Sequence, residues 1–194
     1  MIGGRIYVAI VLLSSVLGCG DDGPSTTPMP DSSTDVSIDA PMSAPCWFDT
    51  YTPAGTIALG TGNDYVPMGD HVNLEYGSQN GFHIPVHARI TGLAPGNPTD
   101  PLDEGNPRTR FHGFFVATGE PVNPGRCGIR LGYVPNGGAF DLARGSAILF
   151  DTALTGVDLF GIQVRVVVEI IDASGNYAID EKVVTCDPPI GWSM

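Results

Sequence analysis

Three of the four histidines lie close together in the sequence, at His71, His83 and His87. Imidazole binds transition metals and titrates near neutral pH, so these residues could hold a metal ion or transfer a proton. On a helix, a spacing of four residues would bring His83 and His87 onto one face. On a strand, the same spacing separates them by about 13 Å, which is too far for one metal ion. The element that carries these histidines therefore decides their chemistry.

The residues around the histidines alternate between apolar and polar side chains, which is typical of a strand with one buried face. Apolar residues recur at every second position from Phe82 to Ile90. The positions between them form a predicted solvated face: His83, Pro85, His87 and Arg89. Because proline cannot donate a hydrogen bond to a sheet, the pattern predicts an edge strand or a bulge at Pro85. Residues 72–76 alternate in the same way.

A tight loop at residues 77–81 would join these two segments into a hairpin. The apolar faces match in one register, which sets three pairs opposite each other: Tyr76 with Phe82, Glu75 with His83, and His71 with His87. In that register the Cβ atoms of His71 and His87 lie about 5 Å apart, close enough to share a metal ion. A crossover to a facing sheet at residues 77–81 would separate them. The favoured interpretation is a solvated sheet face without a metal, and a metal-binding protein is the alternative.

The loop at residues 77–81 contains Gln79 and Asn80. Their side chains either lock the turn through hydrogen bonds or form a binding tip together with His83. Tight turns commonly require a positive φ angle, where glycine carries no Cβ penalty, and Gly81 is the candidate for that position. We therefore predict that Gly81→Val costs roughly 1–2 kcal/mol of stability. His83→Ala should be nearly neutral on a solvated face.

Acidic residues gather in one long loop, where Asp100, Asp103 and Glu104 could supply oxygen ligands to calcium. Their spacing matches no EF-hand, and Arg108 and Arg110 could balance their charge locally. No serine occupies a Gly-x-Ser-x-Gly elbow, and no carboxylate pair suggests glycoside hydrolysis. The sequence therefore favours a protein that is not an enzyme and that uses no cofactor.

The N-terminus predicts a lipoprotein. Arg5 precedes an apolar run at residues 6–17, which has the length of a signal-peptide core and is too short to span a membrane. The run is followed by Gly18 and Cys19, and the junction resembles the lipobox at which bacterial lipoproteins are cleaved and acylated. A plain secretory signal with an incidental cysteine is the alternative. Residues 1–18 are interpreted as the signal peptide and Cys19 as the lipidation site.

Residues 19–45 contain almost no apolar side chains. Such a segment cannot offset its ordering entropy and is expected to form a flexible tether. Gly20, rather than an aspartate, follows the cysteine, which by resemblance to the enterobacterial sorting rule indicates the outer membrane. Residues 46–194 then make one domain of ordinary size. The expected location is the bacterial cell envelope, with a lipid anchor in the membrane.

Three cysteines follow Cys19 in the sequence: Cys46, Cys127 and Cys186. An exported protein folds in an oxidising compartment, so one disulfide and one remaining thiol are expected. Cys46 and Cys186 lie at the two ends of the domain, which are usually far apart in an immunoglobulin-like sandwich. A pair that uses Cys127 is therefore favoured, and its partner is left open. None of the spacings indicates a zinc site or a redox motif.

The composition favours an all-β fold. The chain contains 26 glycines and 17 prolines among 194 residues, and no segment shows a long helical period. Residues 160–172 and 177–185 alternate most strongly and predict a C-terminal hairpin that is central to its sheet. About eight strands at this spacing indicate an immunoglobulin-like β-sandwich, with a closed β-barrel as the alternative.

The charge of the chain argues against nucleic acid as a partner. The formal net charge is −12 and Lys182 is the only lysine, so no basic stripe is present to neutralise phosphates. The acidity suits a soluble domain outside the cell. The expected partners are the membrane, through the lipid anchor, and an envelope protein or glycan.

Three further segments accompany the Gly77-x-Gln79-x-Gly81-x-His83 motif: residues 59–62, 65–68 and 171–175. Together they resemble uncharacterised lipoproteins of myxobacteria and related soil or marine bacteria, over most of residues 46–185. The resemblance implies a lipid-anchored envelope protein with this fold and carries no established activity or catalytic residue. The expected function is a non-catalytic surface binding or structural module, and the metal-binding protein remains the alternative.

Overall fold

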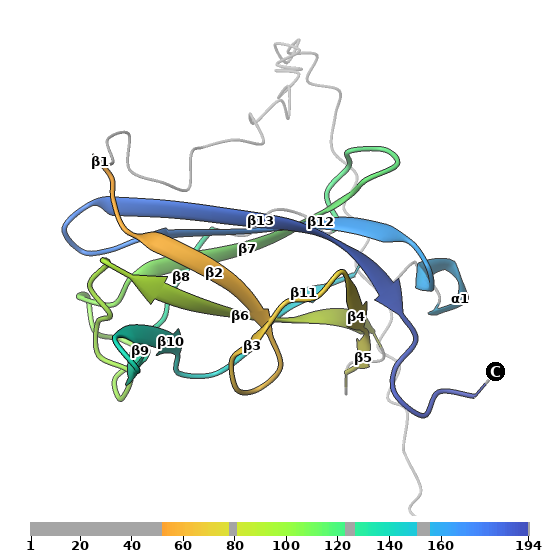
Figure 1. Cartoon of the computed structure of the whole chain (residues 1–194), viewed down its shortest axis with the longest axis horizontal. Helices are drawn as coiled ribbons and strands as arrows, with labels where there is room; N and C mark the ends of the chain where they lie inside the picture. Colours follow the sequence, from red (N-terminus) through yellow and green to blue (C-terminus); the bar gives the residue numbers. More distant parts are fainter. Residues whose placement is uncertain (1–51, 78–80, 123–126, 151–155, 194) are drawn as a thin grey trace, which may run out of the picture. The chain divides into compact units, whose positions relative to one another are not determined.

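Two β-sheets make up the described part of the chain (Figure 1). The computed structural model describes residues 52–77, 81–122, 127–150 and 156–193. These residues form thirteen strands and one helix of four residues, α1 (Gly156–Leu159), so the all-β prediction is confirmed. The strands outnumber the prediction because many have only two to four residues. No helix within these ranges is long and apolar enough to cross a membrane.

The first sheet has six strands in the order β1-β13-β12-β7-β8, and β4 also pairs with β13. Its strands are β1 (Thr52–Pro53), β4 (His71–Asn73), β7 (Arg108–Phe115), β8 (Ile129–Arg130), β12 (Gln163–Ile171) and β13 (Asn176–Asp187). The predicted C-terminal hairpin is confirmed as β12 and β13, with β12 lying between β13 and β7. Its turn is fastened by Asp172, which accepts the backbone N–H groups of Ser174 and Asn176.

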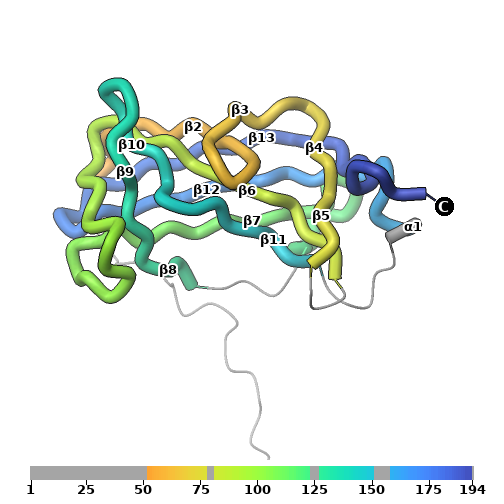
Figure 2. The backbone as a smooth tube through the Cα atoms, turned by 90° about the horizontal axis from the view of Figure 1, so that it is seen from below, coloured from red at the N-terminus to blue at the C-terminus, as the bar shows by residue number. Residues whose placement is uncertain are grey.

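The second sheet has seven strands and is built around one of them, β6. Its strands are β2 (Thr56–Thr61), β3 (Val66–Pro67), β5 (Glu75–Tyr76), β6 (Phe82–Thr91), β9 (Tyr133–Asn136), β10 (Ala139–Leu142) and β11 (Ser146–Leu149). Four strands pair directly with β6: β2 and β5 along one edge, and β10 and β11 along the other. Figure 2 shows β6 running through the middle of this sheet.

The core is formed by the inward faces of the two sheets. The fully buried positions with 0% exposure include every second residue of the two central strands: Ile84, Val86, Ala88 and Ile90 of β6, and Val164, Val166, Val168 and Ile170 of β12. Burying an aliphatic side chain of this size contributes about 1.5–3 kcal/mol. The period of two that predicted these strands is therefore also the pattern that holds the sheets together.

The prediction that β6 is an edge strand is wrong, because β6 has partners on both edges, whereas a bulge at Pro85 stays a prediction. The carbonyl oxygen of Pro85 accepts a hydrogen bond of 2.9 Å from the hydroxyl of Thr61. The N and C=O groups of one residue point to the same edge of an antiparallel ladder. The missing N–H of Pro85 therefore falls in the gap on that edge between the short ladders made by β5 and β2.

The hairpin of β9 and β10 was not among the predicted elements. Residues 136–138 read Asn-Gly-Gly, which is a strong signal for a two-residue hairpin turn. Gly137 and Gly138 both have positive φ angles, 58° and 91°, as a type I′ turn requires. This signal could have been used to find the hairpin.

Cys186 is a free thiol that is fully buried in the core, at 0% exposure. Burial raises its pKa to about 12, so the thiol stays protonated at neutral pH. Cys186 is therefore not a disulfide partner, which corrects its place among the three candidates. Cys46 lies outside the described residues, as does the predicted lipidation site Cys19, so a disulfide that uses Cys127 stays a prediction.

Candidate functional site

The first part of the predicted hairpin register is confirmed where β5 meets β6. Glu75 pairs with His83 and Tyr76 pairs with Phe82. The imidazole Nε2 of His83 lies 3.1 Å from a carboxylate oxygen of Glu75. Gly77 donates its N–H to the carbonyl of Gly81 at 2.8 Å and closes the loop.

The predicted residues at the tip of this loop, Gln79 and Asn80, lie outside the described residues. The φ angle of Gly81 is not positive, and an added Cβ would meet no described atom within 4 Å. The reason given for a cost of Gly81→Val is therefore wrong. His83 is also less accessible than expected, because its side chain is only 16% exposed.

The predicted pair of His71 and His87 is wrong, because β4, which precedes β5 and carries His71, belongs to the other sheet. β4 lies parallel to β13, where His71 pairs with Thr185. The imidazole Nδ1 of His71 bonds to the carboxylate of Asp187 at 3.1 Å, whereas His87 pairs with Gly60 on β2. No group of three or more histidine, cysteine, aspartate or glutamate residues in the described ranges is placed to hold a metal ion. His71 and His87, on which the metal-binding alternative depended, therefore do not pair with each other.

The outer face of β6 is covered rather than solvated, which corrects a second expectation. His87 is only 1% exposed and Pro85 is also buried. The ring of Tyr65 packs edge-on against His87 at 5.8 Å, and the guanidinium of Arg89 lies 4.0 Å above the same ring. Arg89 also donates to Asp141 at 2.9 Å. The loop between β2 and β3, which carries Tyr65, therefore closes over this face.

Acid should destabilise the domain through His87. Burial lowers the pKa of His87 below its ordinary value of 6.5, and its Nδ1 has no hydrogen-bond partner in the described residues. The unfolded chain therefore binds this proton more readily, so stability falls as the pH drops below about 6.5. Urea unfolding at pH 7 and pH 5 should show this loss, and His87→Phe should reduce it. Equal losses in both proteins would contradict the assignment.

The acidic loop uses its carboxylates for its own structure. Asp100 accepts the N–H of Leu102 at 2.9 Å, and Asp103 accepts the N–H of Gly105 at 2.7 Å. These are local turns in which a short acidic side chain bonds to the backbone two residues ahead. The expected charge balance by Arg110 is wrong, because Arg110 bonds to Glu169 on β12 instead. The bonds account for these two acidic residues without a bound calcium ion.

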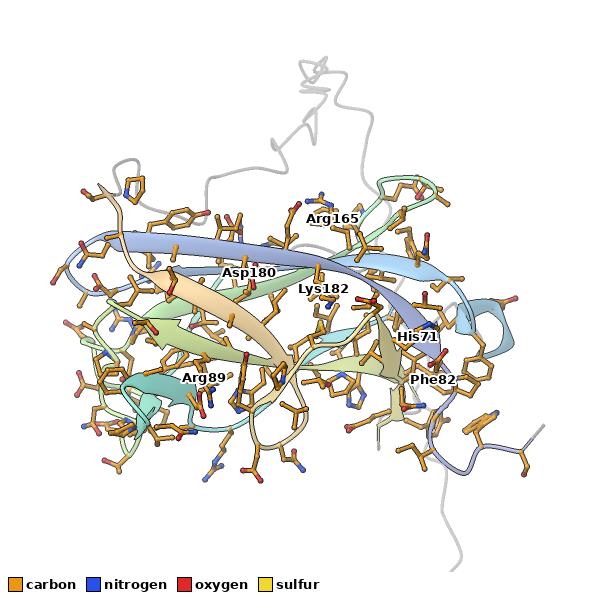
Figure 3. All side chains as sticks on the ribbon, viewed as in Figure 1. His71, Phe82, Arg89, Arg165, Asp180 and Lys182 are labelled. Carbon is orange, nitrogen blue, oxygen red and sulfur yellow. The ribbon has the colours of Figure 1, made fainter. Side chains whose placement is uncertain are left out.

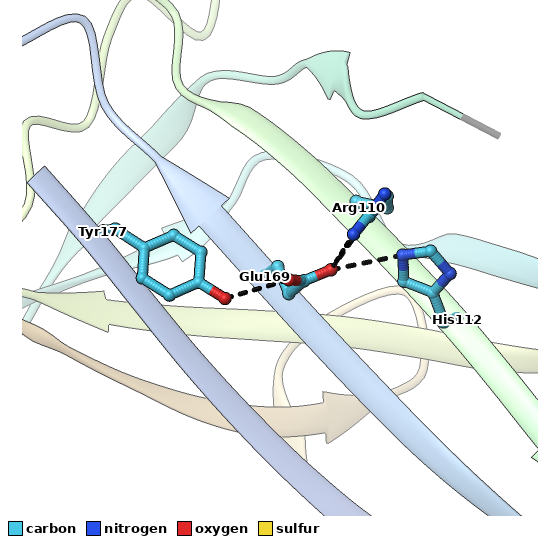
Figure 4. A network of polar contacts seen from close by, with 4 residues as sticks. All are labelled: Arg110, His112, Glu169 and Tyr177. Carbon is cyan, nitrogen blue, oxygen red and sulfur yellow. Dashed lines mark hydrogen bonds and ion pairs between the residues drawn. The ribbon is translucent and has the colours of Figure 1, made fainter. Parts of the chain in front are cut away.

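A buried carboxylate on the outer face of the first sheet joins three strands (Figure 4). Glu169 of β12 accepts from Arg110 of β7 at 2.8 Å and from the hydroxyl of Tyr177 of β13 at 2.9 Å. His112 Nε2 makes an ion-pair contact at 3.3 Å. Burial alone would raise the pKa of Glu169, but the contacts with His112, Arg110 and Tyr177 lower it to about 2. A carboxylate held so firmly in its charged form is a poor general base, so this network serves stability.

Four aromatic side chains meet where β5, β6, α1 and the C-terminal tail converge: Tyr76, Phe82, Phe160 and Trp192, here called the aromatic cluster. Phe82 lies at its centre, with ring centroids 5.0 Å from Tyr76 and 5.3 Å from Trp192. Phe82 is only 7% exposed, whereas Tyr76 is 50% and Trp192 is 44% exposed. The buried ring therefore supports two rings that face solvent.

The aromatic cluster lies at one end of the two-sheet domain. β1 joins β13 at Asn176, whereas β4 joins it at Asp187 and leads into β5. The intervening eleven steps of β13 correspond to about 36 Å at the usual rise per residue. In Figure 3 the labelled Phe82 lies near the C-terminal end of β13, and in Figure 1 β1 lies at the opposite end. The chain therefore enters the described domain far from the aromatic cluster.

The sequence reasoning placed a binding tip at His83 but missed its aromatic neighbours. His83 and Phe82 are consecutive on β6, so their side chains point to opposite faces of the sheet. Trp192 is visible in the sequence as a tryptophan after two prolines near the C-terminus, yet no neighbouring residue indicates that it packs on Phe82.

Comparison of the chain with protein-family models, curated proteins and solved structures finds no match.

Proposed function

We propose that this protein is a lipid-anchored component of a bacterial cell envelope whose domain is a non-catalytic binding module for a glycan. Residues 1–18 would be the signal peptide, Cys19 the acylated residue in the outer membrane, and residues 19–45 the tether. The domain would be an immunoglobulin-like β-sandwich, which the two sheets around one core support. A closed barrel is the alternative fold, and residues 46–194 would make up the domain.

The single observation that carries the binding function is the exposed pair of rings in the aromatic cluster. Scattered apolar residues on a surface are ordinary. Here, however, Tyr76 and Trp192 lie side by side, with centroids 5.9 Å apart, over the buried Phe82. Rigid aromatic side chains bind partners at a low entropic cost. The distance from β1 leaves this end of the domain clear of the point where the tether would join it.

The size of the pair favours a sugar over a protein partner. About half of each ring is exposed, which amounts to roughly 100 Å² per side chain. A stable protein interface needs about 800 Å² on each partner. One or two sugar rings present apolar C–H faces of the smaller size. An envelope glycan is therefore the partner that the aromatic cluster fits.

The test is co-sedimentation of the detergent-solubilised full-length protein with purified peptidoglycan, and its binding to purified lipopolysaccharide. We expect binding to one of these glycans, and a loss of at least tenfold in the Tyr76→Ala, Trp192→Ala double variant, or about 1.4 kcal/mol. Leu102→Ala removes an even more exposed apolar side chain elsewhere and should bind normally. Binding to neither glycan, or unchanged binding by the double variant, would refute the proposal.

The anchor has its own test. Without the thiol of Cys19 there is no sulfur to acylate, so Cys19→Ala should move the protein from the membrane fraction to the soluble fraction. Its mass should also lack the lipid. The control is Cys186→Ala, which removes a buried thiol and should leave the protein lipidated. A Cys19→Ala protein that stays in the membrane with an acylated mass would show that the anchor lies elsewhere.

A further inference from the structure

A cavity of about 410 Å³ opens on the outer face of the first sheet, away from the aromatic cluster. Its walls come from β7, β8, the acidic loop and the turn between β12 and β13. The charged and polar side chains that line it are Arg108, Arg130, Glu104, Asp172 and Ser174. The volume lies within the range of about 300–1,000 Å³ that is usual for small-molecule sites. Its chemistry therefore depends on how these charges are placed.

Two arginines face each other across the ladder at the cavity. Arg108 of β7 pairs directly with Arg130 of β8, which places both side chains on the same face. Like charges directly opposite each other are destabilising. A planar guanidinium matches a carboxylate with two parallel hydrogen bonds. A guanidinium group in a cavity is therefore a suitable partner for the carboxylate of a ligand.

Arg130 differs from most cationic side chains on the two sheets. Four others each have a carboxylate within 4 Å, in these pairs: Arg89 with Asp141, Arg110 with Glu169, Arg165 with Glu181, and Lys182 with Asp70. Arg130 has no such carboxylate in the described part of the chain, although it is half-buried. Its guanidinium is therefore available to a ligand that enters the cavity.

The two acidic side chains of the cavity have different roles. Asp172 is only 3% exposed, and its oxygens accept four hydrogen bonds, from the backbone of Ala94, Ser174 and Asn176 and from the Asn176 amide. Its carboxylate oxygens are therefore already bonded within the protein. Glu104 is exposed and makes no hydrogen bond or ion pair in the described residues. A carboxylate is therefore available at the same cavity as the arginine pair.

We propose that this cavity binds a small zwitterion of the amino-acid class. The ligand carboxylate would lie on Arg130, and its ammonium group would lie on Glu104. A simple anion would gain from the arginines but would meet Glu104 and a chain whose net charge is −12. A simple cation would meet the arginine pair. Only a ligand that carries both charges uses Arg130 and Glu104 favourably.

Calorimetric titration of the full-length protein in detergent tests this with three probes of similar size: L-alanine, acetate and ethylamine. We expect L-alanine to bind at least tenfold more tightly than acetate or ethylamine. Arg130→Gln should weaken L-alanine binding at least tenfold, and Glu104→Gln should reduce it to the level of acetate. Arg144→Gln changes an exposed arginine that does not line this cavity and should bind like the wild type.

Equal binding of L-alanine and acetate, or no binding of L-alanine by a protein that melts normally, would overturn the proposal. So would Arg130→Gln protein that binds L-alanine like the wild type. The result is separate from the proposed glycan function, because Arg130 and Glu104 do not belong to the aromatic cluster. Glycan binding by the Arg130→Gln protein should therefore be unchanged.

Discussion

Glu169→Gln should destabilise the folded domain by about 3 kcal/mol at pH 7 and should have almost no effect near pH 2. The side chain of Glu169 is 15% exposed, and that of its partner Arg110 is 20% exposed, so solvent screens this pair weakly. Its pKa is lowered from 4.5 to about 2 in the folded state. A difference of that size corresponds to about 3 kcal/mol of stability. Glutamine keeps the size of the side chain but removes its charge.

The direction of the pH effect follows from the lowered pKa. Above about pH 4.5 both the folded and the unfolded chain carry a charged Glu169, and its full contribution is present. As the pH falls from 4.5 towards 2, the unfolded chain binds the proton first, and the contribution is lost. Urea unfolding of both proteins at pH 7, 4 and 2.5 should therefore give stabilities that converge in acid.

A surface pair on the same sheet provides the matched control. Glu181 bonds to Arg165 at 2.8 Å, but their side chains are 55% and 43% exposed. Exposed ion pairs of this kind usually contribute less than about 1 kcal/mol. Glu181→Gln should therefore change stability little at any of these pH values. If the Glu169→Gln and wild-type curves ran parallel from pH 7 to pH 2.5, the low pKa of Glu169 would be wrong.

The long strands could be predicted because the alternation of apolar and polar residues within each strand is sufficient to identify it. In β6 and β12 the apolar residues recur with a period of two over at least seven positions, and burial of that face fixes the register. The ladder of Tyr76 with Phe82 followed from the same matching of faces. Strands of two to four residues contain at most three apolar positions, which are too few to distinguish a strand from a loop by their period.

The predicted hairpin register fails at β4, because the local sequence pattern does not determine which sheet this strand joins. In β4, Val72 points inward whether the strand lies beside β6 or beside β13, because both sheets face the same core. Val72 pairs with Cys186, a partner more than a hundred residues away, and Leu74 donates to Asp187 at 2.9 Å. The distance between His71 and His87 depended on that choice, and so did the predicted metal site.

The candidate sites depend on the same long-range choices. The aromatic cluster combines residues from β5, from β6, from the end of α1 and from the C-terminal tail. The cavity places Arg108 opposite Arg130 only because β8 adds to the edge of β7. Each side chain was visible in the sequence as an ordinary exposed or charged residue. Only the pairing of distant strands assigns them neighbours, so their chemistry could not be predicted before the fold.

Gly132→Ala should be among the most damaging single-methyl changes in the domain, at a cost of about 3 kcal/mol. A Cβ at Gly132 would lie 2.4 Å from the Cα of Pro98 and 2.7 Å from the carbonyl carbon of Asn97. Both are backbone atoms, which cannot rotate away as the end of a side chain could. The link between β8 and β9, which contains Gly132, is also held to the loop on either side of the contact. Tyr133 donates to the carbonyl of Pro95 at 2.9 Å, and Leu131 donates to the carbonyl of Pro107 at 3.0 Å.

The comparison with Gly81→Ala isolates the steric cause. Both glycines lack a positive φ angle, so backbone strain contributes to neither change. At Gly81 the added methyl group meets no described atom within 4 Å, and its effect should be small. Urea unfolding should give a midpoint for Gly132→Ala well below that of the wild type and of Gly81→Ala. Equal midpoints for the two variants would mean that the acidic loop does not pack on Gly132. The wall that this loop contributes to the cavity at Arg108 and Arg130 would then be misplaced as well.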